Sequence, residues 1–381
     1  MDAVTKTKRD VAAKRARLRP VLDDADLSAL VLSSYESVSV FAGTNIITQF
    51  AVPDRFEFAI LTRDGATIFL ACNLETEQIR RQTDIGDIHE YVEFEEEPMD
   101  ALARVLRESG VSSGRVGVEA RRLPRSHISV LEAAAPRFEL VPVDDELDRL
   151  QAVKDDWEIS MLEYGAQATL DAVLEAAAES SAGTTERAFA ARMCSGMMMR
   201  GGFPEFLVLA TGDSSLETHA EARDKPLEDG RIWRVDLGAR FTGGIFSDLA
   251  RTGVVGEPTT EQEELLAATR AAQQAGFDVI EPGRPAQDVY HAVAREAKAN
   301  GLPFGMPHVG HGLGLGLHEF PLLEPANATP LAIGMVLNVE PGVMFADREE
   351  VYHTEDLALV TESGYRLLTE PQEALLRMGR A

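Results

Sequence analysis

The sequence of 381 residues predicts an α+β protein in two parts, an α/β domain over residues 1–145 and a second domain over residues 150–381. The first part contains short apolar runs bounded by Gly, Asp or Ser, which is typical of buried strands. The second part contains longer segments of helical periodicity that alternate irregularly with strand patterns, which favours α+β over a doubly wound sheet. A chain of this length is also expected to form about two or three domains.

In the first domain, an Arg- and Ala-rich stretch at 10–19 predicts a helix, and four short apolar runs predict strands. These strands are expected at 27–32, 56–61, 67–70 and 116–118. Two acidic runs, 93–97 and 144–148, are interpreted as solvated edges. This half of the sequence contains no group of His, Asp and Glu with a spacing that indicates a site.

The second domain is expected to open with a long helix after Ala152, where Trp157, Met161 and Tyr164 repeat at helical spacing. Further helices are predicted at 185–199, 259–277 and 285–300. Thr259 and Gln262 have the spacing of a capping box at the start of the second of these. Strands are predicted at 206–210, 232–241, 245–255, 335–340 and 357–361.

The charge balance excludes several classes of function. The chain has 63 Asp and Glu against 37 Lys and Arg, a net charge of −26, and only six of its basic residues are lysines. A nucleic-acid-binding surface and an anionic membrane surface both need clustered cations, so neither is expected. The apolar share of 45% excludes a disordered chain. An acid-rich, lysine-poor chain suits a salt-loaded cytoplasm, so we expect a halophilic host, with an acidic mesophilic enzyme as the alternative.

The cysteines and the N-terminus indicate a soluble cytoplasmic protein. Cys72 and Cys194 are far apart and lie in no zinc-like spacing, so neither a disulfide framework nor a thiolate metal site is expected. No apolar h-region follows the basic N-terminus, and no apolar run approaches the length of a membrane span.

Two predicted hairpins in the second domain bring acidic residues together. Asp236 and Asp248 are equidistant from Thr242, so a hairpin centred there places them opposite one another. Glu340 and Glu355 are expected to face each other in the same way, with 346–349 as the turn. Facing carboxylates repel, and a cation between them relieves the repulsion. A solvent-facing hairpin with incidental acids remains the alternative for either one alone.

A glycine-rich run, MPHVGHGLGLGLHEFP, carries three of the eight histidines, His308, His311 and His318. Glycines beside histidines allow close approach of the backbone and let the imidazoles point at a common site. No Lys-Ser or Lys-Thr follows the glycines, so a phosphate loop is disfavoured. Histidines bonded to backbone in a tight turn are the structural alternative.

The chain resembles the superfamily of methionine aminopeptidase, Xaa-Pro aminopeptidase, prolidase and creatinase, which has the pita-bread fold. The resemblance rests on the order and spacing of Asp236, Asp248, His311, Glu340 and Glu355, on His219 upstream, and on the motif His318-Glu319-Phe320-Pro321. It covers nearly the whole chain. It implies a creatinase-like N-terminal domain and a pita-bread catalytic domain of the Xaa-Pro peptidase type.

The same resemblance implies a site with two divalent ions. Asp236 would chelate one ion, and Asp248 and Glu355 would bridge both. His311 and Glu340 would complete the second position. Four carboxylates and one imidazole suit Mn²⁺, which is the expected ion, with Co²⁺ or Zn²⁺ as alternatives. A metal-bridging hydroxide would attack the amide bond before proline, since two such ions activate water and polarise a carbonyl.

The resemblance also implies catalytic roles and a partner. Glu340 would accept the proton of the nucleophile, and His219 and His318 would stabilise the tetrahedral intermediate. The substrate would be a small peptide, and a homodimer is expected. Arg251 and Thr252 match the family pattern and are expected to support the first hairpin.

Three departures from the family pattern bear on specificity. Each of the two carboxylate pairs is separated by one residue more than usual, within the predicted turns, and His308 precedes His311 by three residues instead of four. His353 replaces an arginine of the kind that prolidase-like enzymes use for the free carboxylate of a dipeptide, which argues against a strict dipeptidase.

Two alternatives remain open. One is a small-molecule C–N amidohydrolase on the same fold, similar to creatinase or ectoine hydrolase. The other is a non-catalytic binding protein, against which the complete set of five ligands argues. A nicotinamide dehydrogenase is excluded because no glycine fingerprint lies between a strand and a helix.

Overall fold

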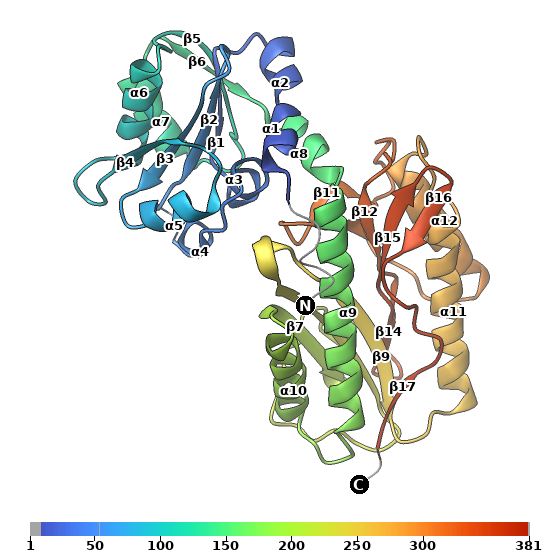
Figure 1. Cartoon of the computed structure of the whole chain (residues 1–381). Coiled ribbons are helices and arrows are strands. Elements are labelled where there is room, and N and C mark those ends of the chain that lie inside the picture. Colours follow the sequence, from blue (N-terminus) through green and yellow to red (C-terminus); the bar gives the residue numbers. More distant parts are fainter. Residues whose placement is uncertain (1–8, 53, 380–381) are drawn as a thin grey trace. The chain divides into compact units, whose positions relative to one another are not determined.

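The computed structural model describes residues 9–52 and 54–379 and divides into two compact units. The first unit is Arg9–Gln151 and the second begins at Ala152 (Figure 1). Within the described residues, every helix is too short or too polar to cross a bilayer.

The first unit is built on a mixed six-stranded sheet with the order β4-β3-β2-β1-β5-β6 (Figure 1). Its strands are β1 (Ala29–Leu32), β2 (Phe58–Thr62), β3 (Thr67–Cys72), β4 (Asp87–Tyr91), β5 (Gly114–Val118) and β6 (Phe138–Pro142). The β1–β2 and β2–β3 pairs are antiparallel, and the other three pairs are parallel. All four predicted strands of this half are present.

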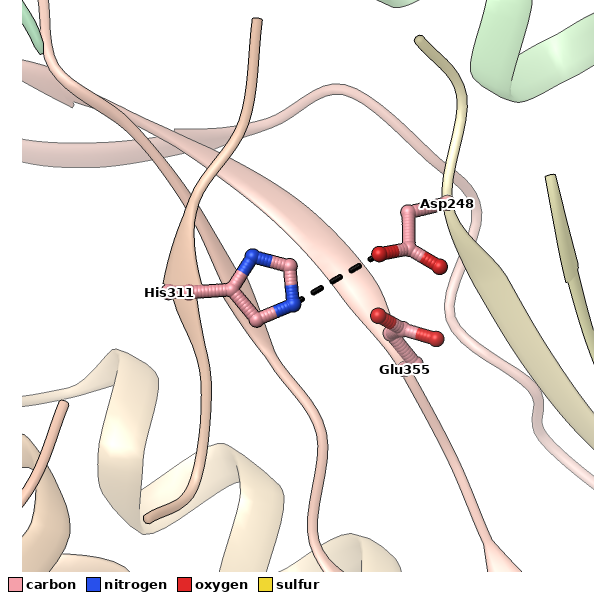
Figure 2. Close-up of side chains that lie close together, drawn as sticks. All are labelled: Asp248, His311 and Glu355. Carbon is pink, nitrogen blue, oxygen red and sulfur yellow. Dashed lines mark ion pairs between the residues drawn. The ribbon is translucent and has the colours of Figure 1, made fainter. Parts of the chain in front are cut away.

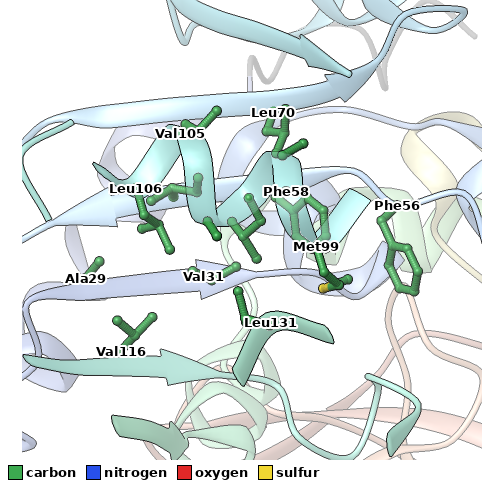
Figure 3. Packing of buried hydrophobic residues seen from close by; sticks show 14 of the residues in the cluster. Ala29, Val31, Phe56, Phe58, Leu70, Met99, Val105, Leu106, Val116 and Leu131 are labelled. Atoms are coloured by element: carbon green, nitrogen blue, oxygen red, sulfur yellow. The ribbon is translucent and has the colours of Figure 1, made fainter. Parts of the chain in front are cut away.

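The helices of the first unit are α1 (Val11–Ala16), α2 (Arg19–Asp24), α3 (Tyr35–Ala42), α4 (Ile47–Ala51), α5 (Thr76–Gln82), α6 (Pro98–Glu108), α7 (Arg125–Ala134) and α8 (Asp144–Ala152). They include three that contact this sheet, namely α3, α5 and α6, and α7 adds Leu131 to its core. Figure 3 shows Met99, Val105 and Leu106 of α6 against sheet residues such as Phe58 and Val116. Burial of these side chains stabilises the unit by about 2 kcal/mol each.

Two expectations for the first unit were wrong in detail. The helix expected at 10–19 is divided into α1 and α2, and Pro20 lies in the first turn of α2. Proline has no N–H to continue a preceding helix and is tolerated in a first turn. The acidic run 144–148 is not wholly solvated, because Asp144 is buried and its carboxylate accepts the N–H groups of Ala120 (3.0 Å) and Arg121 (2.9 Å).

The second unit combines three sheets with two pairs of helices. Its helices are α9 (Asp156–Ala178), α10 (Glu186–Met199), α11 (Thr260–Phe277) and α12 (Ala286–Ala299). Its strands are β7 (Phe203–Thr211), β8 (Ile232–Arg240), β9 (Leu249–Val255), β10 (His311–Gly312), β11 (Glu319–Leu322), β12 (Val336–Val339), β13 (Gly342–Phe345), β14 (Glu350–His353), β15 (Asp356–Thr361), β16 (Gly364–Leu367) and β17 (Leu376–Met378). The predicted capping box is confirmed, with Gln262 N donating to Thr259 Oγ1 at 3.2 Å.

The sheets have the orders β17-β9-β8-β7, β11-β10-β12-β15-β16 and β13-β14. Helix α9 contacts β8 and β9, and α10 contacts β7. Helices α11 and α12 pack on the five-stranded sheet, where Phe277, Val289 and Val293 meet Leu337 and Val339 in one core. Strand β14 contacts both β8 and β9, so the β13–β14 hairpin joins the two larger sheets. This arrangement holds strands from separate sheets close together.

The first acidic hairpin has a different register from the one expected. Ala250, rather than Asp248, lies opposite Asp236 in the β8–β9 ladder. Gly243 and Gly244 both have positive φ, 78° and 82°, and the turn is centred on Gly243 instead of Thr242. The two aspartates are therefore diagonal neighbours on one face, still close enough for their charges to interact.

The second acidic hairpin has the expected register. Ladder β12–β15 and ladder β13–β14 follow the same alignment, so Glu340 and Glu355 lie opposite one another in the gap between them. Residues 346–349 form the turn, as predicted. In this gap the two residues do not hydrogen-bond to each other through the main chain. The Glu340 N–H donates to Val309 O (2.9 Å), and the Glu355 N–H donates to Ala250 O (3.2 Å).

Candidate metal centre

Five strands, or the residues directly next to them, supply the five predicted ligands. Asp236 lies within β8, Asp248 directly precedes β9 and His311 begins β10. Glu340 directly follows β12, and Glu355 directly precedes β15. Figure 2 shows Asp248, His311 and Glu355 pointing toward a common point from separate strands. The gap in the second hairpin therefore brings Glu340 and Glu355 close to the carboxylates of the first hairpin.

Four of the five predicted ligands fall into two overlapping groups. The ligand atoms of Asp248, His311 and Glu355 lie within 4.8 Å of one another, and so do those of Glu340, His353 and Glu355. His311 Nε2 lies 3.5 Å from Asp248 Oδ2 and 3.5 Å from Glu340 Oε1. Asp236, the fifth predicted ligand, belongs to neither group, but it interacts electrostatically with Asp248, because its carboxylate helps to raise the pKa of Asp248.

Close backbone approach brings His311 into this position. Gly310 has φ 148°, and a Cβ there would lie 1.9 Å from Asn338 O, so only glycine fits. The His311 Nδ1–H donates to Gly312 O at 3.0 Å, which leaves Nε2 with a lone pair directed at the carboxylates. Burial lowers the pKa of His311 to about 4, so the imidazole is neutral at pH 7 and able to bind a metal.

Burial and mutual repulsion raise the pKa of several carboxyl groups here. The pKa values of Asp248 and Glu355 lie well above their ordinary range, first because both are buried and then because each faces other carboxylates. The pKa of Asp236 is also raised by burial, and Arg234 and His353 partly oppose this. Glu340 differs: burial opposes its ionisation, but His353, His311 and His308 outweigh it and hold its pKa at about 2.

The donor set fits a hard divalent cation. Glu340 Oε1 and Glu355 Oε2 are buried and accept no hydrogen bond from any residue the structure describes. Buried carboxylate oxygens without donors are costly unless a cation is bound. Oxygen ligands with one imidazole are typical of Mn²⁺ and similar ions, and both cysteines are free. The residues therefore fit the divalent metal that the sequence indicates.

The two predicted catalytic histidines and His308 lie around a cage formed by the side chains of Asp248, His311, Glu340 and Glu355. The His318 ring stacks on the His311 ring, with centroids 3.8 Å apart and an interplanar angle of 20°. His219 is exposed, and its interaction with Asp236 opposes the rise that burial causes in the pKa of that carboxyl. The pKa of His318 is lowered, first by burial, and His219 adds to this. His308 Nδ1 lies 3.5 Å from Glu340 Oε1. The glycine-rich run thus directs all three of its histidines to one place.

A buried ion pair holds the loop that carries His318. Lys154 Nζ contacts Glu319 Oε2, and the same carboxylate accepts the Gly316 N–H at 2.8 Å. A Cβ on Gly314 would lie 2.6 Å from Glu319 Oε1, so this glycine lets the carboxylate lie against the loop. The sequence showed Glu319 as part of a motif but gave no sign of its partner, 165 residues away.

Arg251 and Thr252 of β9 hold the second hairpin, whereas their support of the first stays a prediction. The buried Arg251 donates to Glu355 O (2.7 Å) and to Asp356 Oδ1 (2.7 Å). Thr252 Oγ1 donates to His353 O (2.8 Å) and accepts the His353 N–H (2.9 Å). These contacts fix the main chain on both sides of Thr354.

Arg234 is a residue of the site that sequence reasoning missed. It lies in strand β8, is 5% exposed and places Nη1 3.8 Å from Asp236 Oδ2. Its position between Trp233 and Val235, two residues before a predicted ligand, was the signal that could have identified it.

Two sheets that meet at a cage of carboxylates and one histidine define a metal-dependent hydrolase with the pita-bread fold. The chain belongs to metallopeptidase family M24: residues 162–362 match this family, and residues 14–153 match the creatinase/prolidase N-terminal domain. The family resemblance and the fold class predicted from the sequence are confirmed.

Similar proteins cover nearly the whole chain. The Xaa-Pro dipeptidase of Pyrococcus furiosus is 29% identical over 364 residues, which are 94% of this chain and 98% of that relative. The structure of an Xaa-Pro dipeptidase from Bacillus anthracis has a TM-score of 0.86 at 25% identity, over 97% of this chain and 100% of that one. An X-Pro aminopeptidase from Thermotoga maritima, at 22% identity, shares the fold with a TM-score of 0.84, covering 96% of this chain and 99% of its own.

Proposed function

We propose that this chain is a metallo-exopeptidase of the Xaa-Pro type, which hydrolyses the amide bond before proline in small peptides. The observation that carries the proposal is the cage of Asp248, His311, Glu340 and Glu355, buried where the two large sheets meet. Membership of family M24 and the Xaa-Pro dipeptidases among the similar proteins support the same reaction.

In this proposal the five predicted ligands hold two divalent ions. Asp236 would serve one ion, His311 and Glu340 would serve the other, and Asp248 and Glu355 would serve both. Bound ions of this kind lower the pKa of water and polarise a carbonyl. Mn²⁺ is the proposed ion because four of the five ligands are carboxylates.

The chain's own residues supply the proton transfers and the charge stabilisation. Glu340 is ionised, since its pKa of about 2 is far below neutrality, and can accept a proton from attacking water. His318, stacked on His311 at the exposed side of the cage, is placed to donate to the oxyanion that develops on the substrate. His219 is the proposed second donor.

We further propose a homodimer. Four apolar side chains of the first unit are strongly exposed: Ile47 (54%), Phe50 (48%), Leu74 (61%) and Phe94 (98%). Two hydrogen bonds hold their segments side by side, Thr48 Oγ1 to Glu75 Oε1 (2.6 Å) and Glu93 N to Asn73 Oδ1 (3.0 Å). A patch of this kind is typical of an interaction surface, and the molar mass in solution measures the oligomeric state. Cytoplasmic location stays a prediction from the sequence.

The test of the reaction uses purified full-length chain, dialysed against chelator and reloaded with Mn²⁺, Co²⁺ or Zn²⁺ in high KCl. Release of the N-terminal residue is measured for Xaa-Pro dipeptides and for Xaa-Pro-Xaa peptides, and hydrolytic ring opening is measured for ectoine, a small cyclic amidine. We expect metal-dependent cleavage of Xaa-Pro bonds, with longer peptides accepted because His353 stands where prolidase-like enzymes have arginine. Asp248→Asn is the matched inactive control.

Two other outcomes would favour the alternative functions, a small-molecule amidohydrolase or a binding protein. Cleavage of ectoine without cleavage of any peptide would replace the proposal by an amidohydrolase on the same fold. Absence of bound metal together with absence of turnover would leave a binding protein.

A further inference from the structure

We propose that Arg234 and His353 form a positioning pair that sets the hydrogen-bonding state of Glu340 and keeps His353 out of the metal coordination. The consequence for turnover rests on the proposed function, in which Glu340 is the proton acceptor. The consequence for the imidazole itself does not depend on the substrate.

Arg234 is a buried contact point for three parts of the site. Its Nη2 donates to Thr218 O at 2.7 Å, next to His219 in the chain. Its Nη1 lies 3.5 Å from His353 Nδ1 and 3.8 Å from Asp236 Oδ2. The guanidinium is planar and carries only donors, so it holds these groups in one fixed arrangement.

The donor character of Arg234 determines the tautomer of His353. Because a guanidinium cannot accept a hydrogen bond, the Nδ1 that faces it at 3.5 Å must be the unprotonated nitrogen. The ring proton is then on Nε2. His353 Nε2 is buried, has no other hydrogen-bond partner among the described residues and lies 3.7 Å from Glu340 Oε2. The N–H is therefore directed at the Glu340 carboxylate.

The ring has little freedom to change this arrangement. His353 is 4% exposed, and both its N–H and its C=O are bonded to Thr252 Oγ1, at 2.9 Å and 2.8 Å. The backbone is thus tied to β9 while the ring lies between Arg234 of β8 and Glu340. A separation of 3.7 Å is long for a hydrogen bond, and a small rotation of the Glu340 carboxylate closes it.

The same tautomer excludes His353 as a metal ligand. Glu340, His353 and Glu355 have ligand atoms within 4.8 Å of one another, so distance alone allows His353 to bind an ion. Binding needs a lone pair on Nε2, which would move the proton to Nδ1, against the guanidinium. His311 shows the opposite case: its Nδ1 faces a carbonyl, Gly312 O at 3.0 Å, so its Nε2 is free for metal. Two histidines of one site thus have opposite tautomers because of their partners.

The first experiment is long-range ¹H–¹⁵N NMR of the histidine rings in the full-length chain, metal-free and loaded with diamagnetic Zn²⁺. The His353 signals are assigned by their loss in His353→Asn. We expect a protonated Nε2 on His353 in both states, and an Nε2 on His311 that shifts when Zn²⁺ binds. A His353 Nε2 that is unprotonated, or that shifts as a metal ligand does, would overturn the proposal. Neither signal requires a substrate, so a wrong substrate class leaves this result intact.

The second experiment uses amide replacements of the ring. In His353→Gln the amide N–H lies near the Nε2 position, and in His353→Asn it lies near Nδ1. We expect His353→Gln to keep kcat within about fivefold of the parent, and His353→Asn to lose about 10- to 100-fold, as for other groups that orient metal ligands. Equal kcat in the two variants would contradict the assigned direction of the hydrogen bond.

The third experiment removes the guanidinium. Arg234→Met should weaken Mn²⁺ binding, measured by calorimetry, about 10- to 100-fold and give a mixture of His353 tautomers in the NMR spectrum. Arg240→Met is the matched control, since Arg240 lies on the same strand and pairs with Glu205 away from the cage. Its Mn²⁺ affinity should stay within about threefold of the parent. Parent-like affinity together with a single Nε2–H tautomer in Arg234→Met would refute the role of the pair.

Discussion

Burial and repulsion between like charges both raise the pKa of Asp248 and of Glu355. Each carboxyl faces other acids in a dry environment, and the pKa of each rises well above its ordinary value of about 4. A divalent ion reverses this balance, since it favours the ionised form of both. Metal binding is therefore coupled to proton release at the residues that hold the metal.

This coupling predicts that the raised carboxyl pKa values make the metal-free protein less stable as the pH rises. A carboxyl whose pKa is raised by folding stabilises the folded state at low pH, and this contribution is lost as pH rises through the raised value. His311 and His318, whose pKa values are lowered, act in the opposite direction up to the ordinary histidine pKa of about 6.5, so the test is made above it. The melting temperature of the metal-free chain should fall from pH 7 to pH 9, and that of the Mn²⁺-loaded chain should not. Scanning fluorimetry at constant ionic strength measures both.

The control for the pH effect is Asp248→Asn, which removes one of the groups responsible. Its metal-free melting temperature should depend less on pH over the same interval. A metal-free parent chain that becomes more stable from pH 7 to pH 9 would contradict the explanation.

His318 provides a test that separates catalysis from metal binding. Its ring stacks on His311 but it is exposed and belongs to neither group of close ligand atoms. His318→Ala should lower kcat about 10²- to 10³-fold, the usual effect of removing one oxyanion donor. The metal content, measured by mass spectrometry after gel filtration, should remain that of the parent chain. Loss of both ions in this variant would show that His318 supports the metal instead.

At the scale of elements, the site depends on how closely two backbones approach. A Cβ on Gly238 would lie 2.1 Å from Ser247 O, next to Asp248, so glycine allows β8 to lie against the segment that carries this aspartate. The turn with two glycines of positive φ then sets the register that makes Asp236 and Asp248 diagonal neighbours. Local backbone geometry thereby decides a distance between two charges.

Gly238→Ala tests this relation. The new methyl group must displace a main-chain oxygen, so we expect a loss of about 3 kcal/mol in the free energy of unfolding, at the upper end of overpacking effects. We also expect weaker Mn²⁺ binding, because Asp248 moves with Ser247. Urea unfolding and calorimetry provide the two measurements.

Gly305→Ala is the matched control, since a Cβ there meets no atom within 4 Å. It should change neither measurement beyond about 0.5 kcal/mol. Unchanged metal affinity in Gly238→Ala would show that the carboxylates tolerate a shifted hairpin.

At the scale of the whole molecule, the net charge of −26 has a physical cost. Like charges spread over the surface repel in dilute salt, and this repulsion is screened over about 10 Å at 0.1 M salt and about 3 Å at 1 M. Salt does not screen the repulsion within the cage in this way, because its carboxylates are buried away from mobile ions. Only bound cations can relieve that repulsion.

The surface charge predicts stabilisation by salt. The melting temperature of the metal-loaded chain should rise between 0.1 M and 2 M KCl, as screening removes the repulsion. Sucrose at equal osmolality controls for effects of water activity and should give a smaller rise. A melting temperature that falls as KCl is added would refute the expectation of a halophilic host.

Much of the fold could be predicted because its signals are local. Apolar runs marked the buried strands, and Thr259 with Gln262 marked the start of α11. Equal spacing about the turn at 346–349 placed Glu340 opposite Glu355 in the correct register. The same reasoning failed by two residues for Asp236 and Asp248, because positive φ at Gly243 and Gly244 moved the centre of the turn. A sequence pattern shows that a turn exists but not which dihedral angles it adopts.

The sequence by itself determined the kinds and order of the groups in the site: four acids, one histidine among glycines, and the family to which they belong. Only the tertiary structure decided what surrounds them. Arg234 and His353 are 119 residues apart, and Lys154 and Glu319 are 165 apart. Such contacts arise when separate sheets pack together, and nothing in the local periodicity of either segment encodes them. The chemical identity of the site is therefore local information, while its tautomers, charges and geometry follow from packing.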